Sequence, residues 1–467
     1  MRLASGGDAS PLIAFSAAAD TRGLTSPRSL CSIERDFVMT RLSSRLILTT
    51  VAITLVSSPA IAQRVNYEEP PISYSVAKPD NRVSQLQEKL DAGTAALKFE
   101  TEHGYLKSLL EQLKISTSSQ VLSFGRTSLQ DDKISPTTPR ALYFGDDVHL
   151  GYVQNGLIEI AAHDPSLGMV FYTLKQTDDA PPVFQRQTNS CLTCHGAART
   201  KNVPGVLIRS VYPDPGGHPV VAAGSFVSTH KSPLNQRWGG WYVTGKHGDQ
   251  QHLGNLILTT AKKPKTIDNS AGHNLVNLTD RFDTTKYLSP HSDLVALMVL
   301  EHQTDTLNIL TTASFEMRHA QYLIEQSGGD AEAKEKTTKL HADRLAKNTE
   351  QIVRAFLFAE EAKLTAPVAG SSEFTSEFAS RGPKDSKGRS LRDFDLQTRM
   401  FKHPCSYLID TPAFDSLPEE LKQYVGQRMS EVLSSSELPK GLEHLSAADR
   451  VAIREILTEI KPGFLKP

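Results

Sequence analysis

Two cysteines and a histidine stand within five residues of one another in the segment CLTCH. They are Cys191, Cys194 and His195. Thiol and imidazole groups at this spacing can anchor a porphyrin, exchange a disulfide or bind a metal ion. A shuffled chain with the same 4 Cys and 15 His would contain the pattern only about 0.001 times. The motif therefore calls for a chemical explanation.

Each of these chemistries makes a further demand on the chain. Covalent haem needs two thiols one helical turn apart, each adding across one vinyl group, and a histidine for the iron. A thioredoxin-like redox pair needs a long helix after the cysteines, whereas residues 196–205 contain two glycines and a proline. Structural zinc needs four ligands, and Cys405 is the only other cysteine after residue 62. Haem attachment gives every residue of the motif a role.

The N-terminal region indicates export. A short basic stretch at 39–45 precedes an apolar run at 46–56, and residues 57–62 end in a small-x-small pattern typical of signal-peptidase sites. We expect cleavage before Gln63. The apolar run is shorter than the ~20 residues of a membrane-spanning helix, so no transmembrane anchor is expected after cleavage.

The segment before Met39 has no apolar block of its own. We therefore expect translation to begin at Met39 and leave residues 1–62, with Cys31, out of the fold. The whole chain carries a net charge of −1 and 39% hydrophobic residues. This composition is typical of a globular protein and does not predict binding to nucleic acid or to anionic lipid. Cys405 is expected to be a small buried hydrophobe, with a disulfide to another chain as the alternative.

Apolar periodicity predicts an α+β fold, with an antiparallel β-rich region that holds the motif and a mostly helical region after it. Asn155-Gly156 is a strong hairpin signal. The expected strands are 141–144, 148–153, 157–162, 169–174, 206–211 and 220–227, with shorter candidates at 241–244 and 256–260. The expected helices are two short ones within 83–113, a helical hairpin over 290–325 and 334–364, and 393–401, 417–434 and 446–460. We divide the chain into residues 1–62, 63–281 and 282–467.

The CxxCH motif resembles the haem-attachment motif of c-type cytochromes. The resemblance implies one covalent haem c, with Cys191 and Cys194 as the thioether cysteines and His195 as the proximal iron ligand. The strands expected around the motif differ from the common small all-helical cytochrome fold. The flanking segments RALYFGDD, QRWGGWYVTGKHGDQQHLGN and RGPKDSKGRSLRDFDLQTR are similar to exported single-haem bacterial proteins of unassigned role.

The second axial ligand of the iron is harder to find in the sequence. His302 is the first candidate, because it lies on the apolar stripe of a long predicted helix, where a buried imidazole needs a partner. A hydrogen-bonded core histidine is the alternative for it. Met298 and Met169 are further candidates. Arg209 and Arg237 could pair with haem propionates, but a surface cation explains each as well.

Two main functions follow from a haem outside the cytoplasm, in the periplasm or beyond. The first is electron transfer with exported redox partner proteins. The alternative is a haem-dependent oxidoreductase that acts on a small molecule at an open distal site. In that case the polar loop 245–252, with its two histidines and a carboxylate, would handle protons. A structural or sensory role for the haem is a third reading.

Overall fold

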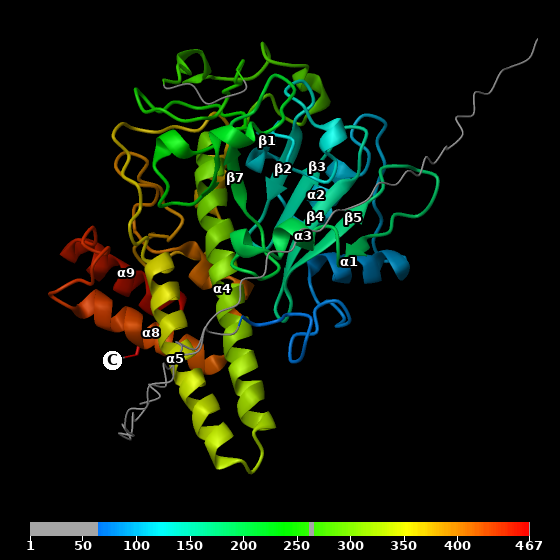
Figure 1. The fold of residues 1–467 in the computed structure, drawn as a ribbon. Helices are drawn as coiled ribbons and strands as arrows, with labels where there is room; N and C mark the ends of the chain where they lie inside the picture. The colour runs from blue at the N-terminus through cyan, green and yellow to red at the C-terminus, as the bar shows by residue number, and fades with distance from the viewer. Residues whose placement is uncertain (1–63, 261–265, 467) are drawn as a thin grey trace, which may run out of the picture. The chain divides into compact units, whose positions relative to one another are not determined.

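The computed structural model describes residues 64–260 and 266–466 and shows the predicted α+β fold (Figure 1). The proposed start at Met39, the signal peptide and Cys31 lie outside the described residues. Residues 62–467 form one unit. The larger of two hydrophobic clusters in the described residues runs from Ile72 to Leu457, so strands before residue 281 and helices after it share an interior.

An antiparallel sheet with strand order β1 to β6 precedes the motif. Four of its strands were predicted, and the turn at Asn155, with φ 55°, joins β3 to β4 as the Asn-Gly signal indicated. The strands are β1 (Val121–Ser123), β2 (Arg140–Phe144), β3 (Val148–Tyr152), β4 (Ile158–Asp164), β5 (Gly168–Leu174) and β6 (Gln185–Gln187).

The two faces of this sheet carry different side chains, because neighbouring residues of a strand point to opposite faces. The register aligns Leu150 with Ile160 and Tyr172 on one face. We call it the apolar face, and its residues in β3, β4 and β5 are Val148, Leu150, Tyr152, Ile158, Ile160, Ala162, Val170, Tyr172 and Leu174. The other face, here the histidine face, carries His149, Gly151, Glu159, Ala161, His163, Met169 and Phe171 in the same strands.

Two N-terminal helices, α1 (Arg82–Asp91) and α2 (Leu106–Gln112), belong to the apolar side of the sheet. The Asn81 side chain caps α1 and also donates to the hydroxyl of Tyr172 at 3.0 Å. The hydroxyl of Tyr152 donates to the carbonyl of Glu102. Both tyrosines lie on the apolar face, so this face is closed by the chain that precedes the sheet.

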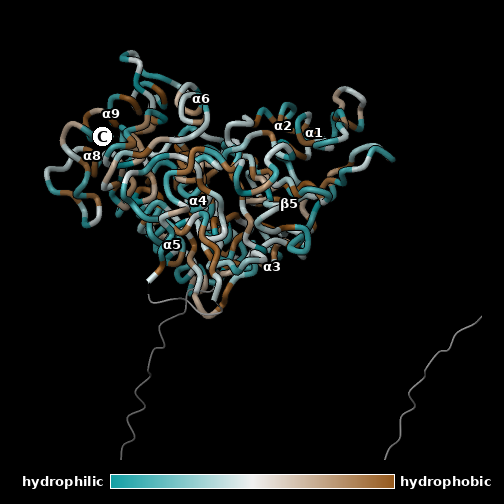
Figure 2. Tube along the Cα trace, turned by 90° about the horizontal axis from the view of Figure 1, so that it is seen from above, coloured by the Kyte–Doolittle hydropathy of each residue, from teal (hydrophilic) through white to brown (hydrophobic). Residues whose placement is uncertain are grey.

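The helical hairpin consists of α4 (Leu294–Gln326) and α5 (Ala331–Phe356), as predicted. Asp293 caps α4, and every residue from Leu294 to Thr304 is buried. Both views place α4 between the sheet on one side and α5, α8 and α9 on the other (Figures 1 and 2). A helix in that position is buried on all sides. A single apolar stripe in the sequence therefore describes its buried residues poorly.

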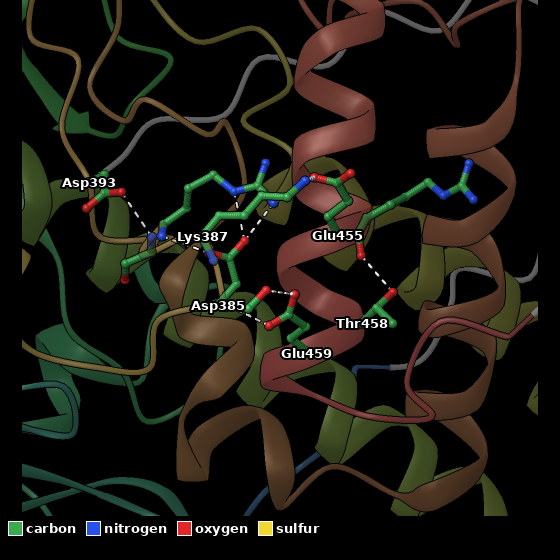
Figure 3. A network of polar contacts seen from close by, with 10 residues as sticks. Asp385, Lys387, Asp393, Glu455, Thr458 and Glu459 are labelled. Atoms are coloured by element: carbon green, nitrogen blue, oxygen red, sulfur yellow. Dashed lines mark hydrogen bonds and ion pairs between the residues drawn. The ribbon is translucent and has the colours of Figure 1, made fainter.

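The remaining helices are short or C-terminal. The Ser446 capping box of α9 is present as predicted. These helices are α3 (Leu192–His195), α6 (Phe374–Ser380), α7 (Pro412–Asp415), α8 (Glu419–Ser434) and α9 (Ala447–Ile460). Ion pairs and hydrogen bonds from 385–393 to Glu455 and Glu459 fasten the preceding loop to α9 (Figure 3).

Three predicted elements are wrong. No helix forms at 393–401, where Leu396 has φ 56° and Phe394 stacks on Phe401 across a tight turn. Residues 241–244 and 256–260 are not strands, since Trp241 and Thr244 make only isolated bridges. The predicted strand at 220–227 is shorter and later, because a 3₁₀ turn precedes Gly224. A second sheet pairs β7 (Ile208–Val211) with β8 (Ser225–Ser228).

Apolar residues gather inside this packing, and the tube coloured by hydropathy shows them along the buried part of α4 (Figure 2). Within residues 64–260 and 266–466, no helix has the length and apolar character needed to cross a bilayer.

Candidate haem attachment site

The CLTCH segment forms a single helical turn. The backbone N–H of His195 donates to the carbonyl of Cys191 at 2.9 Å, and Gly196 ends the turn as its C-cap. Leu192 is buried and anchors the turn in the core. Cys194 is exposed, Cys191 is half-buried, and both thiols are free. Two unpaired thiols therefore stand one turn apart, directly before a histidine.

The ring of His195 is held in one orientation and one tautomer. Its Nδ1 lies 2.9 Å from the carbonyl oxygen of Gly205. A carbonyl only accepts hydrogen bonds, so Nδ1 carries the proton and Nε2 keeps a free lone pair. Burial lowers the pKa of His195, which keeps the ring neutral. A neutral imidazole with a free Nε2 and a carbonyl behind Nδ1 is the form in which histidine ligates a metal.

Helix α4 positions the carbonyl that holds His195. The Asn308 side chain accepts from the N–H of Val206 at 3.1 Å and donates to its carbonyl at 2.7 Å. A Cβ on Gly205 would lie 2.1 Å from Oδ1 of Asn308, so no side chain fits there. The hydroxyl of Thr200 also donates to the carbonyl of His195. A glycine in the loop and an asparagine 103 residues later thus fix the histidine.

The surroundings of Cys191 do not favour a redox pair. Burial and the charge of Glu159 raise its pKa to about 11, so the thiol stays protonated at neutral pH. Reactive redox cysteines have lowered pKa values, commonly at the start of a long helix. Helix α3 has only four residues. Zinc is not favoured either, since no group of three or more His, Cys, Asp or Glu in the described residues could hold a metal ion.

Cys405 lies away from the motif, in the core. It is 0% exposed, and burial raises the pKa of its thiol well above the ordinary value. In this fold the thiol does not reach the surface, where a disulfide to another chain would form.

The motif lies over the histidine face. The ring of His195 packs on Phe171 of β5 with centroids 5.1 Å apart. Arg140 and Glu159 form a 2.8 Å ion pair at the far end of this face, and both affect the pKa of His195. Helix α3 therefore covers the β4 and β5 part of the sheet, beside β5 in both views (Figures 1 and 2).

Two arginines near Cys194 have no carboxylate partner among the described residues. They are Arg199 and Arg209. Burial and the charge of Arg199 lower the pKa of Arg209, whereas Cys194 raises it. Arg199, Arg209 and Cys194 are therefore neighbours. The buried Nε of Arg209 has no hydrogen-bond partner. By contrast, Arg237 is buried in a 3.0 Å ion pair with Glu301. Of the two arginines weighed for propionates, only Arg209 is free to bind one.

His302 occupies a different part of the core. Its Nε2 lies 2.7 Å from the hydroxyl of Ser406, its Nδ1 lies 3.3 Å from Nδ1 of His230, and its ring stacks on Phe358 at 4.2 Å. Asn308, the α4 residue that reaches the motif, is six residues further on and so rotated by about 240°. No contact in the described structure joins His302 to the motif. Iron ligation by His302 stays a prediction without support from these contacts.

The two methionine candidates also differ in position. Met298 is 4% exposed in the hydrophobic core on α4. Met169 is 1% exposed at the start of β5, on the histidine face and paired across the sheet with His163. Only Met169 shares a surface with the motif.

Sequence reasoning missed two histidines on that surface. His149 and His163 are buried on the histidine face, and burial lowers the pKa of each to about 4. The signal was available in VHLGY and IEIAAHD, where alternation places each histidine opposite the apolar residues of its own strand. The proximity of His149 to His195 depends on packing and could not be predicted.

Histidines also cluster at the loop 245–252. His247 and His252 are buried, with centroids 4.6 Å apart, and both rings contact His273. Nε2 of His247 accepts from the backbone of Asn274. The ring of His252 packs against Trp238. In the described structure none of these contacts reaches residues 191–195, so a proton-handling role of this loop in a distal pocket stays a prediction.

Comparison with protein-family models, with curated proteins and with solved structures found no match to this chain.

Proposed function

We propose that this protein is an exported c-type cytochrome that carries one covalent haem and transfers electrons. The observation that carries the proposal is the state of His195. Its Nδ1 is engaged by a backbone carbonyl and its Nε2 is free, one residue after two unpaired thiols on a single helical turn. A redox pair would not need this histidine, and a structural zinc site would need more ligands.

Each residue of the motif has a defined part in holding the group. Cys191 and Cys194 would hold the group through thioether bonds: the S–H of each would add across one vinyl double bond, with sulfur bonding to one carbon and hydrogen to the other. Nε2 of His195 would face the iron. When bound, haem supplies a one-electron couple between ferric and ferrous iron. Arg209 and Arg199, which lie near Cys194, would be available to pair with propionates, since a guanidinium suits carboxylates.

Location and partners follow from the sequence and extend the proposal. The N-terminal pattern favours export, and thioether attachment of this kind suits an exported protein. The partners would be other exported redox proteins that dock weakly. A chain with net charge −1 offers no general attraction to nucleic acid.

The experiment is expression in a host that has haem-maturation machinery, followed by denaturation. We expect pigment that stays with the polypeptide in acidified acetone and gives a pyridine haemochrome spectrum of one haem per chain. The double variant Cys191→Ala with Cys194→Ala should lose the covalent pigment, whereas Cys405→Ala should keep it. Wild-type protein without pigment, or pigment that extracts into the solvent, would overturn the proposal.

Carbon monoxide separates electron transfer from the alternative, a haem-dependent oxidoreductase with an open distal site. A reduced protein whose spectrum is indifferent to the gas supports the electron carrier. A protein that binds the gas at once supports the oxidoreductase.

A further inference from the structure

His149 of β3 is a buried side chain without a use in the described fold. It is 7% exposed, and neither ring nitrogen has a hydrogen-bond partner among the described residues. Leaving a buried polar group unpaired costs about 1–3 kcal/mol, so most such groups find a partner. An imidazole with both nitrogens unsatisfied therefore points to a ligand.

The sheet places His149 in one row with the residue that supports His195. His149 pairs with Ala161 of β4, and Ala161 pairs with Phe171 of β5, on which the His195 ring packs. Strands lie ~4.8 Å apart, so His149 stands about two strand spacings from Phe171. In this row only Ala161, with its methyl group, lies between them, and the next residue of β3 on this face is Gly151. His149 and Phe171 thus lie on either side of a small side chain.

The electrostatics agree with this placement. The pKa of His149 is lowered to about 4, mainly by burial and also by the charges of His163 and His195, so the ring is neutral and near both. His149 thus lies on the same face as the residue that supports His195 and close enough for the charge of His195 to act on it.

Helix α4 supplies a group that would orient His149. The amide nitrogen of Gln303 donates to the carbonyls of Gly145 and Asp146, which fixes the side chain. Oε1 of Gln303 accepts no hydrogen bond in the described structure. Gln303 partly offsets the lowering of the pKa of His149, although Oε1 is not aligned for a hydrogen bond with the ring. Metal-ligating histidines usually donate their second N–H to such an acceptor. Oε1 of Gln303 is therefore available as an acceptor for one N–H of His149.

We propose that His149 is the second axial ligand of the haem iron, opposite His195, with Gln303 as the acceptor of its other N–H. The inference rests on the proposed function. The rival His302 already has partners at both nitrogens. Bis-histidine ligation fills both axial positions, so the protein carries electrons and has no open site.

The experiment compares the purified haem proteins of wild type, His149→Ala, His149→Met, His163→Ala and His302→Ala. Absorption and electron paramagnetic resonance spectra report spin state, and the haemochrome assay reports haem content separately. We expect a low-spin wild type, His163→Ala and His302→Ala. His149→Ala should lose the low-spin signal and bind carbon monoxide. His149→Met should stay low-spin with a raised reduction potential, because Met with His favours ferrous iron.

A low-spin His149→Ala with unchanged spectra, a high-spin wild type, or loss of the low-spin signal in His302→Ala would each overturn the inference. If His149→Ala does not fold, His149→Met decides, since an unchanged potential and spectrum would exclude the ligand. Failure of the proposed function is distinct, because the wild type would then contain no covalent haem.

Discussion

The two faces of the sheet share the same strands and differ in almost everything else. On the apolar face, Leu150, Ile160 and Tyr172 are buried at 5% exposure or less under the N-terminal segment. On the histidine face, His149 and His163 are also buried, and neither ring nitrogen of His149 has a hydrogen-bond partner in the described chain. Burial of apolar groups stabilises a fold, whereas burial of unpaired polar groups opposes it. The first face is built for stability and the second is compatible with a ligand.

The largest expected effect comes from the apolar face. Leu150→Ala removes a fully buried side chain and should lower the free energy of unfolding by about 2–5 kcal/mol, while the haem spectrum stays unchanged. Urea unfolding and an absorption spectrum measure both. The matched variant Leu142→Ala, at a half-buried position of the histidine face, should cost clearly less. Equal losses at both positions would show that the two faces contribute alike.

His163 should make stability depend on pH. Its pKa is about 4 in the fold, against an ordinary value of 6.5, because burial penalises the charged ring. Well above pH 6.5 the ring is neutral in both the folded and the unfolded state. As pH falls from 6.5 towards 4, the unfolded chain gains a proton that the folded chain does not, so stability is lost. At pH 5 this loss is roughly 2 kcal/mol.

His163→Gln should remove that loss. Urea unfolding at pH 7 and pH 5 gives the comparison, and between pH 7 and pH 8 the variant and the wild type should respond identically. An unchanged difference between pH 7 and pH 5 would mean that the ring is not held neutral.

Asn308 connects α4 to the histidine side. Asn308→Ala removes two buried hydrogen bonds to Val206 and should cost about 1–3 kcal/mol in unfolding free energy. It should also raise the reduction potential, because the Gly205 carbonyl would hold His195 less firmly and the imidazole would become a weaker base. Voltammetry measures the potential. Thr312→Ala on the same helix should change neither quantity by as much, and a normal potential in Asn308→Ala would contradict the coupling.

The smallest expected effect concerns Arg209. Removing a positive charge near the haem favours ferric iron, so Arg209→Gln should lower the reduction potential by roughly 20–40 mV, equivalent to about 0.5–1 kcal/mol. Stability should change little, since Arg209 has no ion pair in the described residues. Arg454→Gln, exposed on α9, is the control and should leave the potential unchanged. Equal shifts in both variants would remove Arg209 from the site.

Elements with strong local signals could be predicted from the sequence. The Asn155-Gly156 turn, the alternating strands β2 to β5 and the Ser446 cap of α9 all depend on residues within a few positions of one another. The helix expected at 393–401 did not form, because stacking of Phe394 on Phe401 outweighed local propensity. Trp241 and Thr244 have strand-forming side chains, but each makes only a single bridge, Trp241 to Ser123 of β1 and Thr244 to Asp293, so no ladder forms.

The candidate site divides in the same way. Cys191, Cys194 and His195 could be found from spacing, because one helical turn brings them together without help from the rest of the chain. The carbonyl of Gly205 and the amide of Asn308 could not be found in this way, because Asn308 lies on a helix 103 residues after Gly205. His302 attracted attention through helical periodicity, yet its partners His230 and Ser406 belong to other segments.

By itself the sequence determined the α+β order of elements and the five-residue motif, because both depend on side chains that are neighbours along the chain. Only the tertiary structure decided which buried histidines share the face under the motif, which arginine is free and which face of the sheet is apolar beneath its helices. Those outcomes depend on strand register and on the rotation of α4. A shift of one residue in register exchanges the two faces, so no local pattern could determine them alone.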